Sequence, residues 1–180
     1  MRQDNRSSYM SGLVWIIIFS TIIYFIFYFA KGFTGEGFPD LVGPYDVVRV
    51  VDGDTIVVSI NEQDRYVRLI GIDAPESTAD ETNKENTPEG QQAGDHAREL
   101  LDGKRVYLEY DTQGYDVYGR KLAYVYFTDG MTMVNEKLVE DGYARIMIIE
   151  PNSKHERRLS LAEDKAKESG SGLWGAGFYK

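Results

Sequence analysis

The chain has 180 residues, no cysteine and a formal net charge of −9. Without thiols, disulfides, thiolate metal sites and cysteine nucleophiles are excluded, and the length predicts one domain with an additional segment. The acidic excess lies in residues 45–180, because residues 1–44 hold three basic and three acidic groups. A nucleic-acid-binding protein usually presents a basic surface, so the acidity argues against sequence-independent binding of a polyanion.

An apolar segment follows a short tail of residues 1–12. Residues 13–30 contain no charge, proline or glycine. As a helix this segment would be about 27 Å long, close to the thickness of a bilayer's hydrocarbon core, so it predicts a single-pass membrane anchor. Arg2 and Arg6 precede it and favour a cytoplasmic amino terminus with the main domain outside. The alternatives are a cleaved signal peptide, whose apolar core is normally shorter, and a buried core helix.

The next segment, residues 31–44, contains four glycines and two prolines and is typical of a linker. The main domain is expected over residues 45–177. It opens with three predicted strands, at 45–51, 54–60 and 65–72. The hairpin signal Asp52–Gly53 joins the first two strands.

A polar loop then leads to a predicted helix over 88–102, with Thr87 as its cap and Pro88 at its first position. Two more strands are expected at 105–110 and 120–127, and amphipathic helices at 132–141 and 154–169. This order indicates an α+β fold, a five-stranded OB-fold barrel with three helices, preceded by the transmembrane helix. Such barrels bind oligonucleotides or oligosaccharides, and strand order alone does not decide between them.

Two carboxylates lie at strand ends of the first meander. Asp54 opens one predicted strand, and Asp73 closes the next. If they meet in space, their oxygens would suit a hard cation such as calcium. The alternative is that both are ordinary turn residues, since aspartate is common in turns.

Two arginines accompany these carboxylates. Arg68 stands in the apolar run YVRLIGI, so part of its side chain is expected to be buried beside an anion, either a carboxylate or a phosphate. Strict alternation places Arg68 and Asp73 on opposite strand faces unless the strand ends or bends near Gly71. Arg120 opens a strand after a glycine. His96 and His155 are expected to be solvated helix residues.

Five blocks in this order resemble the staphylococcal nuclease family: VVDGDTIVV at 50–58, VRLIGIDAPES at 67–77, YDVYGRKLAYVY at 115–126, VNEKLVEDGYAR at 134–145 and GLW at 172–174. They span about residues 45–175. The resemblance implies the OB barrel and calcium-dependent hydrolysis of DNA and RNA phosphodiester bonds.

The resemblance also implies roles for individual residues. Asp54, Asp73 and the carbonyl of Ala74 would be calcium ligands, although well-studied members carry threonine at the position of Ala74. Glu76 would position or deprotonate the attacking water. Arg68 and Arg120 would grip the scissile phosphate, and Tyr118 would touch a flanking phosphate or sugar. Val117 stands where some members have lysine.

The predicted protein is therefore a monomeric nuclease with DNA and RNA as substrates, anchored in the lipid bilayer by residues 13–30 and with no protein partner. The nuclease domain is expected on the extracytoplasmic side. The alternative is a non-catalytic barrel of the same family that binds RNA or protein. An oligosaccharide-binding barrel has only the fold to support it.

Overall fold

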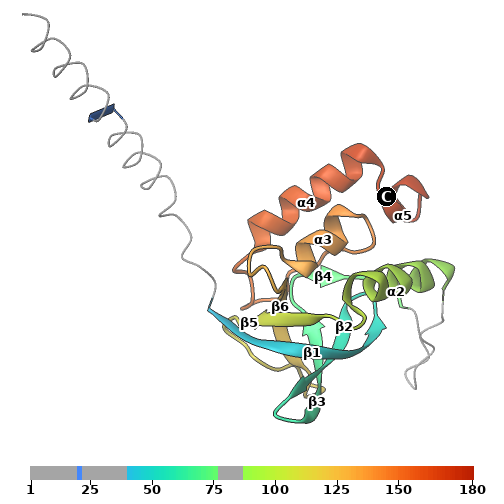
Figure 1. Ribbon diagram of the computed structural model, residues 1–180. Coiled ribbons are helices and arrows are strands. Elements are labelled where there is room, and N and C mark those ends of the chain that lie inside the picture. The colour runs from blue at the N-terminus through green and yellow to red at the C-terminus, as the bar shows by residue number, and fades with distance from the viewer. Residues whose placement is uncertain (1–19, 22–39, 77–86) are drawn as a thin grey trace, which may run out of the picture. The chain divides into compact units, whose positions relative to one another are not determined.

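Strand β1 (Leu41–Asp52) opens a closed five-stranded barrel in the computed structural model, which describes residues 20–21, 40–76 and 87–180 (Figure 1). The other barrel strands are β2 (Thr55–Ile60), β3 (Gln63–Leu69), β5 (Arg105–Glu109) and β6 (Lys121–Phe127). Neighbours follow the order β1-β2-β3-β6-β5, and β5 pairs back with β1 to close the barrel. Only the β3–β6 pair is parallel among these strands. The predicted five-stranded barrel is confirmed, and the arrangement is consistent with an OB-fold.

The three predicted helices are present, together with one short turn at the end. They are α2 (Pro88–Leu101), α3 (Val134–Glu140), α4 (Glu156–Ser169) and the additional α5 (Gly172–Gly175). The hydroxyl of Thr87 accepts a hydrogen bond from Gly90 N at 3.0 Å, as expected of its cap position. Helix α2 packs beside β1, while α3 packs against α4 and β6 (Figure 1).

The core fills the barrel interior and the space under the helices. Ile56, Val67, Leu108 and Val125 on the strands are at most 1% exposed, and Leu159 on α4 is fully buried. All residues of this core lie within residues 40–180, which form one compact unit. That unit therefore has the apolar burial that an independently folding domain requires.

Two boundaries differ from the sequence prediction. Strand β1 begins at Leu41, so residues 41–44 belong to the barrel and not to the linker. The predicted strand 65–72 is interrupted: β3 ends at Leu69, and a separate short strand β4 (Ile72–Asp73) pairs with β7 (Arg145–Ile146). Both β4 and β7 contain two residues, too few to produce a periodic pattern.

Gly71 produces the interruption between β3 and β4. Its φ is +80°, a conformation that side-chain-bearing residues rarely adopt, and a Cβ there would lie 2.5 Å from Cδ1 of Leu159. The backbone therefore turns between Arg68 and Asp73. The turn removes the strict alternation that would have placed these two side chains on opposite faces.

A second correction concerns His155, which is buried beside the amino terminus of α4 and is not solvated. Its Nε2 lies 2.8 Å from Oε2 of the fully buried Glu109, and the hydroxyl of Tyr126 donates to the same carboxylate oxygen at 2.8 Å. Lys154 pairs with the other oxygen of Glu109. His96 is also partly buried, and its Nε2 lies 2.8 Å from a carboxylate oxygen of Asp141.

The expected anchor, residues 13–30, lies outside the described residues except for Ser20 and Thr21, which are helical. Within the described part of the chain, no helix combines the length and apolar character needed to cross a bilayer.

Candidate active site

The β1–β2 turn brings Asp54 into contact with the segment after β4. The side chain of Asp54 is buried, and its Oδ2 accepts a hydrogen bond from Ala74 N at 2.9 Å. Its Oδ1 accepts from the Thr55 hydroxyl at 3.0 Å. Gly53 permits this approach, because a Cβ there would lie 2.6 Å from Cβ of Ala74. Two regions 20 residues apart are thereby joined through one carboxylate.

Arg68 connects Asp54 and Asp73, the two carboxylates at strand ends. It pairs with Thr55 across the β2–β3 ladder, and its Nη1 lies 2.5 Å from Oδ2 of Asp54. Its Nη2 lies 3.6 Å from Oδ1 of Asp73. Because the Arg68 side chain is 18% exposed, the guanidinium is partly buried and paired with carboxylates, as the sequence suggested.

Asp73 is held from its other side by Arg145, a residue to which sequence analysis gave no role. Its Oδ2 accepts from Nε of Arg145 at 3.2 Å and from Nη2 at 3.0 Å. The two residues are direct partners in the β4–β7 pair. The carboxylate of Asp73 thus lies between Arg68 and Arg145.

Arg120 lies where the loop before β6 enters the barrel. Leu122, two residues further on, is the β6 partner of Arg68. Asp116 organises this loop: its Oδ1 accepts from the backbone N of Tyr118 at 3.0 Å and of Arg120 at 2.9 Å. Its Oδ2 accepts from Nε of Arg120 at 2.6 Å. The role of Asp116 was not predicted, although the motif DVYGR contains it.

Tyr118 and Val117 are highly exposed side chains of this loop. Tyr118 is 81% exposed, and the guanidinium carbon of Arg120 lies 5.5 Å from its ring centroid. Val117 is 91% exposed beside it. An exposed aromatic ring next to a cation suits contact with a nucleotide.

Glu76 is partly exposed and follows Pro75 directly. Its backbone carbonyl accepts from Thr87 N at 3.5 Å, so the chain returns here after residues 77–86, which lie outside the described residues. Ala74 is buried beside Asp54. Burial of its side chain is compatible with a role for its main-chain carbonyl. The geometry therefore joins Asp54, Arg68, Asp73 and Ala74 directly, and Glu76 is attached to them through Pro75.

The electrostatics of the site centre on Asp54. Burial raises the pKa of its carboxyl from 3.8 to about 7, even though Arg68 acts in the opposite direction, and the nearby Asp52 adds to the rise. A carboxylate that loses solvation in this way is stabilised by additional positive charge.

The donor atoms at this point are all oxygens. Two carboxylates and a main-chain carbonyl suit a hard cation such as calcium, which accepts irregular oxygen ligation and retains water. Within residues 40–76 and 87–180, no group of three or more His, Asp or Glu side chains is placed to hold a metal. A cation here would therefore need the Ala74 carbonyl and water to complete its ligand set.

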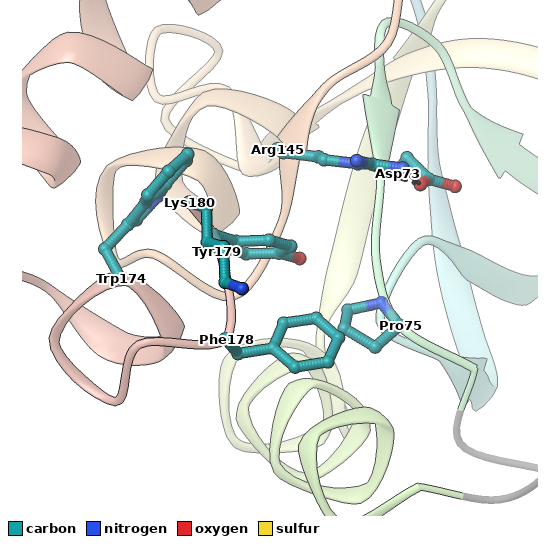
Figure 2. A pocket seen from close by; sticks show the side chains of 7 residues that line it. All are labelled: Asp73, Pro75, Arg145, Trp174, Phe178, Tyr179 and Lys180. Carbon is teal, nitrogen blue, oxygen red and sulfur yellow. Dashed lines mark hydrogen bonds and ion pairs between the residues drawn. The ribbon is translucent and has the colours of Figure 1, made fainter.

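A pocket of about 410 Å³ adjoins the site on the far side of Asp73 (Figure 2). Asp73, Pro75 and Arg145 form one part of its lining, and residues 174–180 supply Trp174, Phe178, Tyr179 and Lys180. Figure 2 shows the rings of Phe178 and Tyr179 directed towards the segment that carries Asp73 and Pro75.

Comparison with known proteins shows the family of this chain. The protein-family model described as staphylococcal nuclease homologue matches residues 66–176 of this chain. The chain belongs to the staphylococcal nuclease family. It is 41% identical to a thermonuclease of Staphylococcus hyicus over 133 residues, which cover 72% of this chain and 75% of the relative. A thermonuclease of Staphylococcus intermedius matches with the same identity and coverage.

A further family member, endonuclease YncB of Bacillus subtilis (strain 168), is 38% identical over 136 residues, which cover 73% of this chain and 61% of the relative. The prediction of a hydrolase of the staphylococcal nuclease type is thereby confirmed.

Proposed function

We propose that this nuclease depends on calcium and hydrolyses phosphodiester bonds of DNA and RNA, with Asp54, Asp73 and the carbonyl of Ala74 as calcium ligands. The observation that carries the proposal is the convergence of both aspartates on Arg68, at 2.5 and 3.6 Å, from strand ends separated in sequence. Bound calcium would supply positive charge at the phosphate oxygens.

The charge balance of the site gives independent support. Each of three arginines is bonded to a carboxylate: Arg68 to Asp54, Arg120 to Asp116 and Arg145 to Asp73. Where these carboxylates are ionised, the positive charge of the arginines is already compensated before a phosphate arrives. A divalent cation would restore the attraction for a polyanion and relieve the poorly solvated carboxylate of Asp54. This accounts for nucleic-acid binding by a protein with a net charge of −9.

The arginines would bind the scissile phosphate. A guanidinium has five N–H donors in a planar fork that matches phosphate oxygens, more donors than one carboxylate uses. The bond from Arg120 to Asp116 engages Nε and orients the rest of the group. Preorganised donors of this kind stabilise the charge that develops on the phosphoryl oxygens during hydrolysis.

Glu76 would position or deprotonate the attacking water, and the exposed ring of Tyr118 would contact a flanking sugar or phosphate. Pro75 restricts Ala74 to extended conformations, which helps to orient the Ala74 carbonyl. The chain thus assembles its proposed phosphate, metal and water groups from one turn, one interrupted strand and one loop.

We also propose that residues 13–30 anchor the enzyme in a membrane, with residues 40–180 on the extracytoplasmic side. This proposal rests on the 18-residue uncharged segment and on Arg2 and Arg6 before it.

The function is tested with residues 40–180, which contain the whole barrel and its core. The fragment should nick supercoiled plasmid and degrade single-stranded RNA in calcium and should lose both activities in a chelator. Tyr118→Ala should weaken cleavage, whereas its matched control Val117→Ala, which truncates the neighbouring exposed side chain, should not. Binding of oligonucleotides without cleavage in calcium would overturn the proposal in favour of a non-catalytic binding barrel.

A further inference from the structure

The pocket in Figure 2 is lined by several aromatic side chains, for which the hydrolysis proposed at the neighbouring site has no use. Its volume of about 410 Å³ lies in the range that accommodates small organic ligands. Three aromatic side chains, Trp174, Phe178 and Tyr179, line it together with Lys180 and with the ion pair of Arg145 and Asp73. Proteins that bind single-stranded nucleic acids stack bases on aromatic rings beside positive charge.

The pocket is contiguous with the proposed site through one carboxylate. Oδ1 of Asp73 faces Arg68 at 3.6 Å, and Oδ2 faces Nη2 of Arg145 at 3.0 Å. Arg145 lines the pocket, so a ligand there would lie directly across Asp73 from the phosphate position at Arg68. A nucleotide next to the scissile phosphodiester would have to occupy a position adjacent to the phosphate-binding arginine, as this pocket is.

Two buried polar groups of the lining have no hydrogen-bond partner among the described residues. They are Nε1 of Trp174 and the hydroxyl of Tyr179. Buried donors are nearly always satisfied in folded proteins, and leaving one unpaired is unfavourable. Burial and the nearby Asp73 carboxylate raise the pKa of Tyr179, so its hydroxyl keeps its proton and remains a donor at neutral pH.

The aromatic side chains are also held in place by one another. The ring centroids of Trp174 and Tyr179 are 5.0 Å apart, and those of Phe178 and Tyr179 are 5.1 Å apart. Nζ of Lys167 lies 4.9 Å from the Trp174 ring centroid and restrains it further. A ligand would therefore meet an aromatic wall that is already largely assembled, which reduces the entropy lost on binding.

We propose that this pocket binds a nucleobase of the substrate strand, adjacent to the phosphodiester held by Arg68. The inference rests on the proposed nuclease function and adds a base-binding subsite to it. A base offers a flat ring for the aromatic wall and, once the rings of Trp174 and Tyr179 shift enough to uncover these donors, carbonyl or ring-nitrogen acceptors for both. An aliphatic ligand would leave both donors unpaired.

The test uses the full chain in detergent with Trp15→Phe, so that Trp174 is the single tryptophan. Tryptophan emission is recorded in chelator, where cleavage cannot interfere, with thymidine 5′-monophosphate, thymidine and ribose 5-phosphate as probes. The two probes with a base should quench the emission saturably, and ribose 5-phosphate should not. Equal quenching by ribose 5-phosphate, or no quenching by either base-containing probe, would overturn the inference.

Tyr179→Phe in the same background removes one donor and keeps the ring. It should raise the Kd of thymidine about two- to tenfold, as loss of one hydrogen bond does. The control Leu161→Ala, which truncates an exposed residue of α4, should leave the Kd unchanged. An unchanged Kd in Tyr179→Phe would contradict the subsite.

Plasmid cleavage in calcium is measured in parallel on the same preparations. Cleavage without quenching by bases would refute the subsite and leave the nuclease function standing. Quenching by bases without cleavage would refute the nuclease function while the pocket still binds its ligand.

Discussion

Asp54→Asn provides a stringent test of the electrostatics at the site. Burial raises the pKa of Asp54 from 3.8 to about 7 in the folded protein, so the unfolded chain loses this proton more readily. A carboxyl with a raised folded pKa contributes its full stability below the unfolded value, and that stability is lost as the pH rises through the folded value. In chelator, the wild-type protein should therefore lose stability relative to Asp54→Asn between about pH 4 and pH 7.

The magnitude follows from the difference between the two pKa values. The pKa values of the unfolded and the folded state differ by about three, and a difference of one corresponds to ~1.4 kcal/mol, so the total effect on the free energy of unfolding is about 4 kcal/mol. About 2.5 kcal/mol of this total is expected to be lost between pH 5 and pH 8. Arg68 and the hydrogen bond from Ala74 N both lower the pKa of Asp54, and their effects are already contained in the value of about 7, so neither is added separately.

The assay is urea unfolding of residues 40–180 at pH 5 and pH 8, in chelator, for the wild type and for Asp54→Asn. The difference in free energy of unfolding between the two proteins should change by about 2.5 kcal/mol in favour of the variant at pH 8. Calcium should remove most of this change, because it stabilises the ionised carboxylate. Parallel pH profiles for the two proteins in chelator would refute the buried-carboxylate argument.

Three other predictions concern different parts of the chain. The pKa of Glu109 is lowered, because the opposing effect of burial is outweighed by hydrogen bonds from Lys154, His155 and Tyr126. Glu109→Gln should therefore lower the free energy of unfolding by roughly 3 kcal/mol in urea at pH 7, and this deficit relative to the wild type should shrink below pH 4.5. A deficit that stays constant down to acid pH would contradict the prediction. Arg120→Lys should lower kcat about a hundred- to a thousandfold with little change in KM. Arg68→Lys should lower kcat at least as much and should also reduce the Tm. If both variants lose oligonucleotide affinity equally but keep wild-type turnover per bound substrate, both arginines are binding residues only. The full chain should pellet with membranes and resist carbonate extraction, and external protease should digest its nuclease domain on intact cells; a soluble mature protein beginning near residue 31 would show that residues 13–30 are a cleaved signal peptide.

Local patterns in the sequence predicted the barrel well. The Asp52–Gly53 turn, the valine-rich strands and the Thr87–Pro88 helix start each depend on residues within a few positions of one another. Such signals act through local backbone preference and hydrophobic periodicity. For this reason they identified five strands and three helices with only small errors at their ends.

Contacts between distant segments could not be predicted in the same way. Arg145 reaches Asp73 across 72 residues through a pair of two-residue strands, and His155 meets Glu109 across 46 residues. Neither pairing produces a periodic pattern. His155 was therefore expected to be solvated, and Arg145 received no role, until the fold brought each to its partner.

The site itself was predicted from a resemblance more than from periodicity. Alternation separated Arg68 from Asp73, and only the positive φ of Gly71 allows them to meet. No local sequence pattern predicted the burial of Asp54 either, because this burial depends on Ala74 and on helix α2, which packs against the β1–β2 turn.

Calcium binding measured together with cleavage tests the central claim most directly. Isothermal titration of residues 40–180 with calcium, and single-turnover plasmid cleavage over the same concentrations, should give matching midpoints for the wild type. Asp73→Asn should shift both midpoints to higher calcium or abolish both, while the control Asp46→Asn, an exposed carboxylate of β1, should shift neither. Equal cleavage in calcium and in chelator, or wild-type midpoints in Asp73→Asn, would contradict the assignment of these oxygens as the metal site.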